Sequence, residues 1–115
     1  NAAHTTSLVV SASGEIKELT DSHGMPLGLY PDRIYSQSEI QLNAGDSIIL
    51  YSDGVTEMAN ESKKHFGSEN LLRNVRQNAN LNPQELIQEL ENQLAEFRGT
   101  AKQSDDVTIM VIKLP

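Results

Sequence analysis

Two segments of the chain are apolar on both faces of an extended strand, and they limit the possible folds more than any other feature. They are SIILYS at residues 47–52 and VTIMVIKL at residues 107–114. Strands that alternate between apolar and polar residues expose one face, whereas strands buried on both faces are almost continuously apolar. We therefore predict that both segments lie centrally in a β-sheet.

Other strands are expected before the first of these segments. The apolar stretch 6–12, the Ser13-Gly14 turn and the stretch 15–19 are typical of a β-hairpin. Residues 34–42 alternate between apolar or small and polar side chains, and this period of two indicates a half-exposed strand. The residues between them, 21–33, contain two glycines and two prolines and are expected to form a loop.

Helical periodicity follows residue 58. Ser68 is the expected N-cap of one helix. A second helix has a stronger N-terminal signal, with Asn82 as N-cap, Pro83 in the first turn and Glu85 closing a capping box. Gly99 is expected to end this helix. Its apolar stripe consists of Leu86, Ile87, Leu90, Leu94 and Phe97. Strands, then helices, then a strand predict an antiparallel sheet with helices packed on one face, an α+β fold.

Composition argues against several classes of function. The chain has 16 acidic and 9 basic residues, a net charge of −7, and no basic cluster longer than Lys63-Lys64, so we expect no nucleic-acid partner. Because it has no cysteine, a disulfide, a thiolate zinc site and a cysteine nucleophile are excluded. No apolar run approaches the roughly 20 residues of a membrane span, so we expect a cytoplasmic protein without membrane contact.

Aspartates stand at one end of each doubly apolar segment. Asp53 directly follows the first segment, and Asp105 and Asp106 directly precede the second. If the two strands are antiparallel neighbours, these carboxylates converge, and sites made of oxygen ligands select hard cations such as Mg²⁺ or Mn²⁺. The alternative is an ordinary Asp-Gly turn and a solvated strand start. Spacing by itself does not decide between them.

Short polar residues border the first aspartate. Ser52 and Thr56 flank Asp53, and we expect both hydroxyls to satisfy backbone groups at the strand end. Glu57 and Glu61 follow. A solvated helix entry and a position near a metal ion explain these two acidic residues equally well. His4 and Gly28 are likewise expected to be structural.

Four motifs in order resemble one family. They are NAAH at residues 1–4, PLGL at 26–29, LNAGDSIILYSDGVTE at 42–57 and SDDVTIMVIK at 104–113. Together they resemble the C-terminal half of a SpoIIE-type phosphatase domain, the bacterial branch of the metal-dependent protein phosphatase (PPM, type-2C-like) family. One departure is Ala3, where that family usually has glycine.

The resemblance implies a fold and a reaction. The fold is an antiparallel β-sandwich with helices outside (αββα), of which residues 1–115 would be the C-terminal part, with the N-terminal part of the domain absent. The reaction is hydrolysis of phosphoserine or phosphothreonine in a bacterial regulatory protein, such as an anti-sigma-factor antagonist, at a two-metal Mn²⁺ or Mg²⁺ centre. By this resemblance Asp53 and Asp105 are metal ligands, with Asp106 in place of Asp105 if the register shifts by one.

The motifs of the family's first half are absent from this chain, which begins at Asn1 rather than at methionine. We therefore expect the 115-residue chain alone to bind Mn²⁺ weakly and to hydrolyse essentially nothing. Open sheet edges and an uncovered apolar face would then favour a homodimer. The alternative function, from another class, is a non-catalytic protein-interaction domain derived from the same fold.

Overall fold

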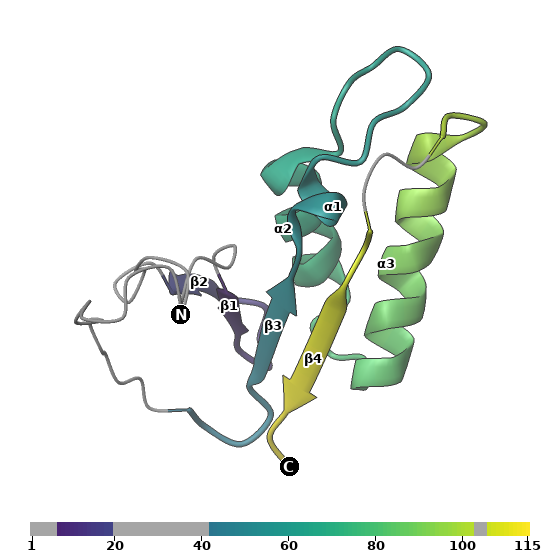
Figure 1. Cartoon of the computed structure of the whole chain (residues 1–115). Coiled ribbons are helices and arrows are strands. Elements are labelled where there is room, and N and C mark those ends of the chain that lie inside the picture. Colours follow the sequence, from purple (N-terminus) through teal and green to yellow (C-terminus); the bar gives the residue numbers. More distant parts are fainter. Residues whose placement is uncertain (1–6, 20–41, 103–105) are drawn as a thin grey trace, which may run out of the picture.

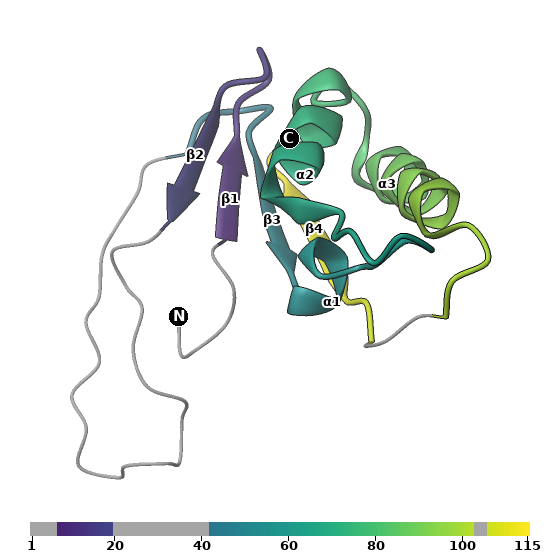
Figure 2. The same cartoon turned by 90° about the horizontal axis from the view of Figure 1, so that it is seen from above.

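The computed structural model describes residues 7–19, 42–102 and 106–115. Its elements are β1 (Ser7–Val10), β2 (Ile16–Leu19), β3 (Ser47–Tyr51), α1 (Asp53–Thr56), α2 (Gly67–Gln77), α3 (Pro83–Arg98) and β4 (Ile109–Lys113). The strands form one sheet in the order β2-β1-β3-β4, and every neighbouring pair is antiparallel. All helices lie on one side of this sheet (Figures 1 and 2). The expected α+β architecture is confirmed.

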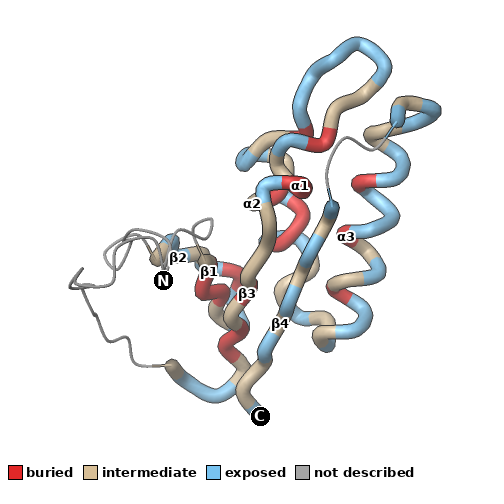
Figure 3. Tube along the Cα trace, in the orientation of Figure 1, coloured by how far each residue is buried: buried red, intermediate tan, exposed pale blue. Residues whose placement is uncertain are grey.

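The core lies between the sheet and the helices. Leu8, Ile49 and Val111 stand side by side across β1, β3 and β4, and their side chains point towards the helices. Buried positions gather on β1 and on the inner sides of α2 and α3 (Figure 3). The buried cluster comprises Leu8, Val10, Ile49, Val55, Met58, Phe66, Leu71, Val75, Leu86, Leu90 and Leu94. Burial of this apolar surface is the main force that holds the helices on the sheet.

Helix α3 forms as the sequence predicts, because its ends are defined by local interactions. The Asn82 side chain accepts a hydrogen bond from the Glu85 N–H at 2.9 Å, and the Glu85 carboxylate accepts one from the Asn82 N–H at 3.3 Å. Pro83 occupies the first helical position, and Gly99, with φ of 60°, follows the last. The β1–β2 hairpin was also predicted and is confirmed.

The predicted start of α2 is wrong. The helix begins at Gly67, its N-cap residue is Phe66, and Ser68 does not cap it. Phe66 is held by tertiary contacts instead: its N–H donates to the Met58 carbonyl at 2.7 Å, and its ring meets Phe97 edge-on with centroids 5.4 Å apart. The residue before the helix is thus held by tertiary contacts rather than by a local side-chain cap.

Of the two predicted central strands, β3 is central in the sheet that the structure describes, and β4 is not. Within the described residues β4 is an edge strand, and Met110 and Ile112 are 55% and 49% exposed. These side chains stand beside Leu50 and Ile48 of β3, on the face away from the helices. The described residues contain no layer over that face, so its apolar side chains remain accessible to solvent.

Some predictions fall outside the described residues. These are the loop at 21–33, the structural roles of His4 and Gly28, and the strand at 34–42, apart from Leu42 itself, which belongs to no strand. Among the helices of the described segments, none has the length and apolar character needed to cross a membrane.

Truncation of a core side chain on α3 should destabilise the fold. Leu90 is 1% exposed, and we expect Leu90→Ala to lower the free energy of unfolding by about 2–5 kcal/mol, because it leaves a cavity. Urea denaturation followed by circular dichroism measures the effect. Gln84→Ala, at an exposed position of the same helix, should change it by less than about 0.5 kcal/mol. Equal unfolding midpoints for the two variants would contradict this packing.

Candidate metal centre

The predicted meeting of the two strand ends is present. Tyr51 is paired with Ile109 at the end of the β3–β4 ladder. One step further on, the Ser52 N–H donates to the Thr108 carbonyl at 3.0 Å. The end of β3 and the approach to β4 therefore lie side by side, at the end of the sheet where α1 stands (Figure 1). Antiparallel pairing thus places Asp53 and Asp106 on neighbouring stretches of chain.

The Ser52 side chain extends this pairing beyond the ladder. Its hydroxyl oxygen accepts a hydrogen bond from the Thr108 N–H at 2.9 Å and donates one to the Asp106 carbonyl at 3.2 Å. The Thr56 hydroxyl donates to the Asp53 carbonyl at 3.5 Å. The prediction that both hydroxyls satisfy backbone groups is confirmed. A single serine therefore ties residues 106–108 to the end of β3.

Gly54 is required by the close approach of the second strand. A Cβ atom built on Gly54 would lie 2.0 Å from the Asp106 carbonyl oxygen, and real Cβ contacts essentially never fall below 3.0 Å. The glycine is buried. Residues 53–56 form the short helix α1, so the interpretation of Asp53-Gly54 as a simple turn is wrong. The missing side chain makes room for the Asp106 backbone.

The two aspartates bordering β3 differ in what their side chains do. Asp46 is 8% exposed, and its carboxylate accepts the Asn43 N–H at 2.8 Å in the turn that precedes the strand. Asp53, the first residue of α1, is exposed, and no described residue hydrogen-bonds to its carboxylate. Asp106 is exposed as well. Asp46 therefore completes a turn, whereas the Asp53 carboxylate is accessible to a ligand.

The surroundings of Asp53 are electronegative. Burial raises the pKa of the half-buried Tyr51 phenol, and the negative charges of Glu18 and Asp53 raise it further. The phenol therefore stays neutral at physiological pH, and the carboxylates provide the local charge. A cation bound at this end of the sheet would be attracted rather than repelled.

The residues present fit part of a divalent-metal site. Carboxylate oxygens are the preferred ligands of Mg²⁺ and Mn²⁺, and Asp53 and Asp106 offer them on adjacent strand ends. Asp105, the other predicted ligand, lies outside the described residues. Within the segments described, no group of three or more histidine, aspartate or glutamate side chains is placed to hold a metal ion. These residues could therefore supply only part of the ligand set that such an ion needs.

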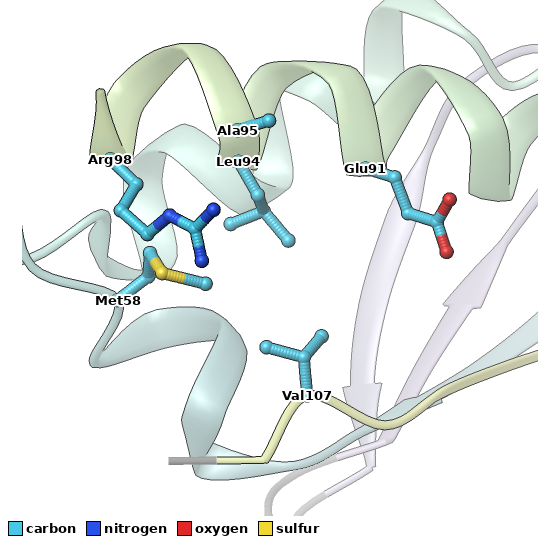
Figure 4. A pocket seen from close by; sticks show the side chains of 6 residues that line it. All are labelled: Met58, Glu91, Leu94, Ala95, Arg98 and Val107. Carbon is cyan, nitrogen blue, oxygen red and sulfur yellow. The ribbon is translucent and has the colours of Figure 1, made fainter. Parts of the chain in front are cut away.

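A cavity of about 300 Å³ opens beside this site, between α3 and the approach to β4 (Figure 4). Val107, the residue after Asp106, lines one side of the cavity. The Arg98 side chain extends from α3 on the other side, and its guanidinium group lies beside Met58. The lining residues of the cavity are Met58, Glu91, Leu94, Ala95, Arg98 and Val107. With a single acidic residue in its walls, the cavity is chemically distinct from the carboxylate site.

Comparison with known proteins gives a consistent result. The family model described as Stage II sporulation protein E (SpoIIE) matches residues 1–115. The SiaA-PP2C domain of Pseudomonas aeruginosa has a similar structure, with a TM-score of 0.81 and 26% identity over 96% of this chain. The manganese-presoaked phosphatase domain of SpoIIE from Bacillus subtilis superposes with a TM-score of 0.71 and 21% identity over 98% of this chain. Protein IcfG of Synechocystis sp. is 25% identical over 112 residues, 97% of this chain.

This chain spans less than half the length of each of the two solved chains named above. It covers 43% of the SiaA chain and 48% of the SpoIIE chain. It covers 17% of Protein IcfG. The expected PPM-type phosphatase fold is confirmed for the part of that fold that the chain spans.

Substitution of Gly54 tests the close approach of the strands. We expect Gly54→Ala to lower the free energy of unfolding by about 1–3 kcal/mol, because the new methyl group collides with the Asp106 backbone. Urea denaturation measures the loss, and amide exchange at Thr108 should become faster. Glu57→Ala, at the exposed position after α1, is the control. If Gly54→Ala is as stable as this control, the two backbones are not in contact.

Proposed function

This chain belongs to the SpoIIE family, and we propose that it contributes metal ligands to a phosphatase that hydrolyses phosphoserine or phosphothreonine in proteins. The observation that carries the proposal is the pairing of β3 with β4, which brings the stretches bearing Asp53 and Asp106 together at one end of the sheet. The similarity to solved phosphatase domains supports the enzyme class.

The proposed metal ligands are Asp53 and Asp105, with Asp106 as the alternative to Asp105. Exposed carboxylates at two adjacent strand ends suit Mn²⁺ or Mg²⁺. A two-metal centre of this kind activates water and offsets the charge on phosphoryl oxygens. Neither aspartate acts as a nucleophile in this proposal. The contacts of Ser52 and Gly54 with residues 106–108 keep the two stretches of chain adjacent, which supports this assignment.

The proposed substrate is a phosphorylated bacterial regulatory protein, such as an anti-sigma-factor antagonist, met in the cytoplasm. Without a bound cation, carboxylates at the two strand ends would repel a phosphate group. Metal binding must therefore precede substrate binding, and activity should depend on the concentration of the divalent cation. Because the motifs of the family's first half are absent from this chain, we propose that the 115-residue chain alone binds Mn²⁺ weakly and has essentially no activity.

A non-catalytic interaction domain is the second candidate. It is favoured by the finding that the described residues include no cluster of three potential metal ligands. A domain of this kind would keep the fold and lose the dependence on metal. The same mutagenesis experiment separates the two candidates.

Loss of the ligand carboxylates should abolish metal-dependent hydrolysis. In the native protein we expect Asp53→Asn and Asp105→Asn each to reduce Mn²⁺-dependent phosphopeptide hydrolysis by more than about 100-fold, because each removes a charged ligand. Asp106→Asn, measured beside Asp105→Asn, shows which of the two is the ligand. Glu69→Gln, at an exposed position on α2, serves as the control.

Unchanged Mn²⁺-dependent activity in both Asp53→Asn and Asp105→Asn would overturn the assignment of the site. Native protein that binds a phosphoprotein but never hydrolyses it, with or without Mn²⁺, would favour the interaction domain.

We further propose that the 115-residue chain self-associates when it is isolated. β4 forms an edge of the described sheet and carries the exposed Met110 and Ile112. An apolar edge strand of this kind is a template for pairing with a second copy.

Sedimentation velocity of the isolated chain should therefore show association that increases with protein concentration. Ile112→Lys should weaken this association by placing a charge on the exposed face, whereas Ile112→Val should retain it. A compact monomer at every concentration would contradict the proposal.

A further inference from the structure

The loop between α1 and α2 carries the only two adjacent basic residues of the chain. Lys63 and Lys64 lie near its tip, His65 follows them, and all three side chains are exposed. We call residues 59–65 the basic loop. Because the chain as a whole has 16 acidic and 9 basic residues, this loop is a local positive site on an acidic protein.

Hydrogen bonds fix the shape of the basic loop. An antiparallel bridge joins Ala59 to His65 at its base. The Asn60 side chain accepts the N–H groups of Ser62 and Lys64 at 2.9 and 3.0 Å, and the Asn60 N–H donates to the Lys64 carbonyl at 2.9 Å. The lysine side chains therefore extend from a preformed backbone, which reduces the entropy lost when a partner binds.

The single acidic residue of the basic loop is engaged by another segment. The Glu61 Oε1 atom accepts hydrogen bonds from the Thr100 hydroxyl at 2.5 Å and from the Thr100 N–H at 3.1 Å, and these bonds lower the pKa of Glu61. Thr100 lies in the turn after α3, so the contact holds the loop against the end of that helix. Among the described residues no carboxylate forms an ion pair with Lys63 or Lys64. Both ammonium groups are thus available to an anionic partner.

Lys63 has a backbone conformation that favours glycine. Its φ is 62°, and no other residue except glycine has a positive φ in the part of the chain that the structure describes. A residue with a Cβ atom adopts this conformation at an energetic cost. No described group bonds to the Lys63 side chain, so the fold of the loop does not explain why lysine stands there. A ligand for its ammonium group does.

The basic loop extends from the end of the sheet at which the proposed metal centre lies (Figure 1). It follows the short helix that begins with Asp53. The Glu57 N–H donates to the Asp53 carbonyl at 2.8 Å, and the Phe66 N–H donates to the Met58 carbonyl at 2.7 Å where the loop closes. A protein bound at the metal centre is large enough to contact this loop as well.

We propose that the basic loop is a docking site for an acidic segment of the phosphoprotein substrate. This inference rests on the proposed function, because it assigns the contact to the substrate of that function. Two exposed lysines suit a supplementary contact at the rim of a protein interface, where complementary charges speed association. Nucleic acid or an anionic membrane would need a larger basic surface, and the net charge of −7 opposes both.

The test uses two synthetic phosphoserine peptides, one with glutamates on both sides of the phosphoserine and one with glutamines in their place. In the native protein with Mn²⁺, the double variant Lys63→Gly, Lys64→Gln should raise KM for the glutamate peptide about 3–10-fold. KM for the glutamine peptide should stay within about two-fold of the wild type, and kcat should not change, because neither lysine belongs to the metal centre. Glycine suits φ of 62°, so the loop should keep its shape in this variant.

The control is Lys17→Gln, which removes the same charge from an exposed position on β2. Its KM for both peptides should equal that of the wild type. If the double variant has the wild-type KM for the glutamate peptide, the docking site is wrong and the phosphatase activity stands.

Direct binding separates the docking site from the proposed function. If the native protein hydrolyses neither peptide, the proposed function is wrong, and fluorescence anisotropy of a labelled, unphosphorylated glutamate peptide then tests the loop. A Kd that the double variant raises about 3–10-fold would support docking of an acidic segment without hydrolysis. An unchanged Kd would overturn the docking site. Binding to phosphatidylserine vesicles that the double variant loses, with no change in the peptide Kd, would also overturn it and assign the lysines to a membrane surface.

Discussion

The pairing of β3 with β4 is the interaction on which the rest of the structure depends. It aligns Ile49 with Val111 above the helices, so it completes the sheet face that the core covers. It also continues past the last ladder pair, where the Ser52 backbone and hydroxyl bond residues 106–108. The β3–β4 pairing thus contributes side chains to the core along its length, and at one end it brings together the two chain segments of the proposed metal site.

The close approach of the chain at Asp53 to the chain at Asp106 is opposed by steric and electrostatic repulsion, and neighbouring residues reduce this repulsion. Two stretches of chain that carry aspartates are brought together, although like charges repel. Gly54 removes the steric obstacle, and Ser52 supplies hydrogen bonds. A divalent cation would remove the remaining repulsion.

Features defined by neighbouring residues could be predicted, and those that depend on distant residues could not. The capping box of α3 involves Asn82 and Glu85, so its residues are visible together in the sequence. At the start of α2, by contrast, Ser68 does not cap the helix, and Phe66, the N-cap residue, packs on the distant Phe97. β4 is apolar on both faces and yet lies at the edge of the described sheet. An apolar pattern does not reveal the strand order or the layer that packs on each face, so the sequence could not predict this position.

The sequence by itself determined the class of fold, the strands that carry the core, and the presence of aspartates at two strand ends. These follow from periodicity and from residues adjacent in the chain. The tertiary structure decided how those ends are held. Ser52 reaches partners 54 and 56 positions away. In the loop between α1 and α2, Glu61 likewise reaches a partner 39 positions away. No periodic pattern encodes such contacts, because they arise only when packing of the sheet and helices has brought the loops together.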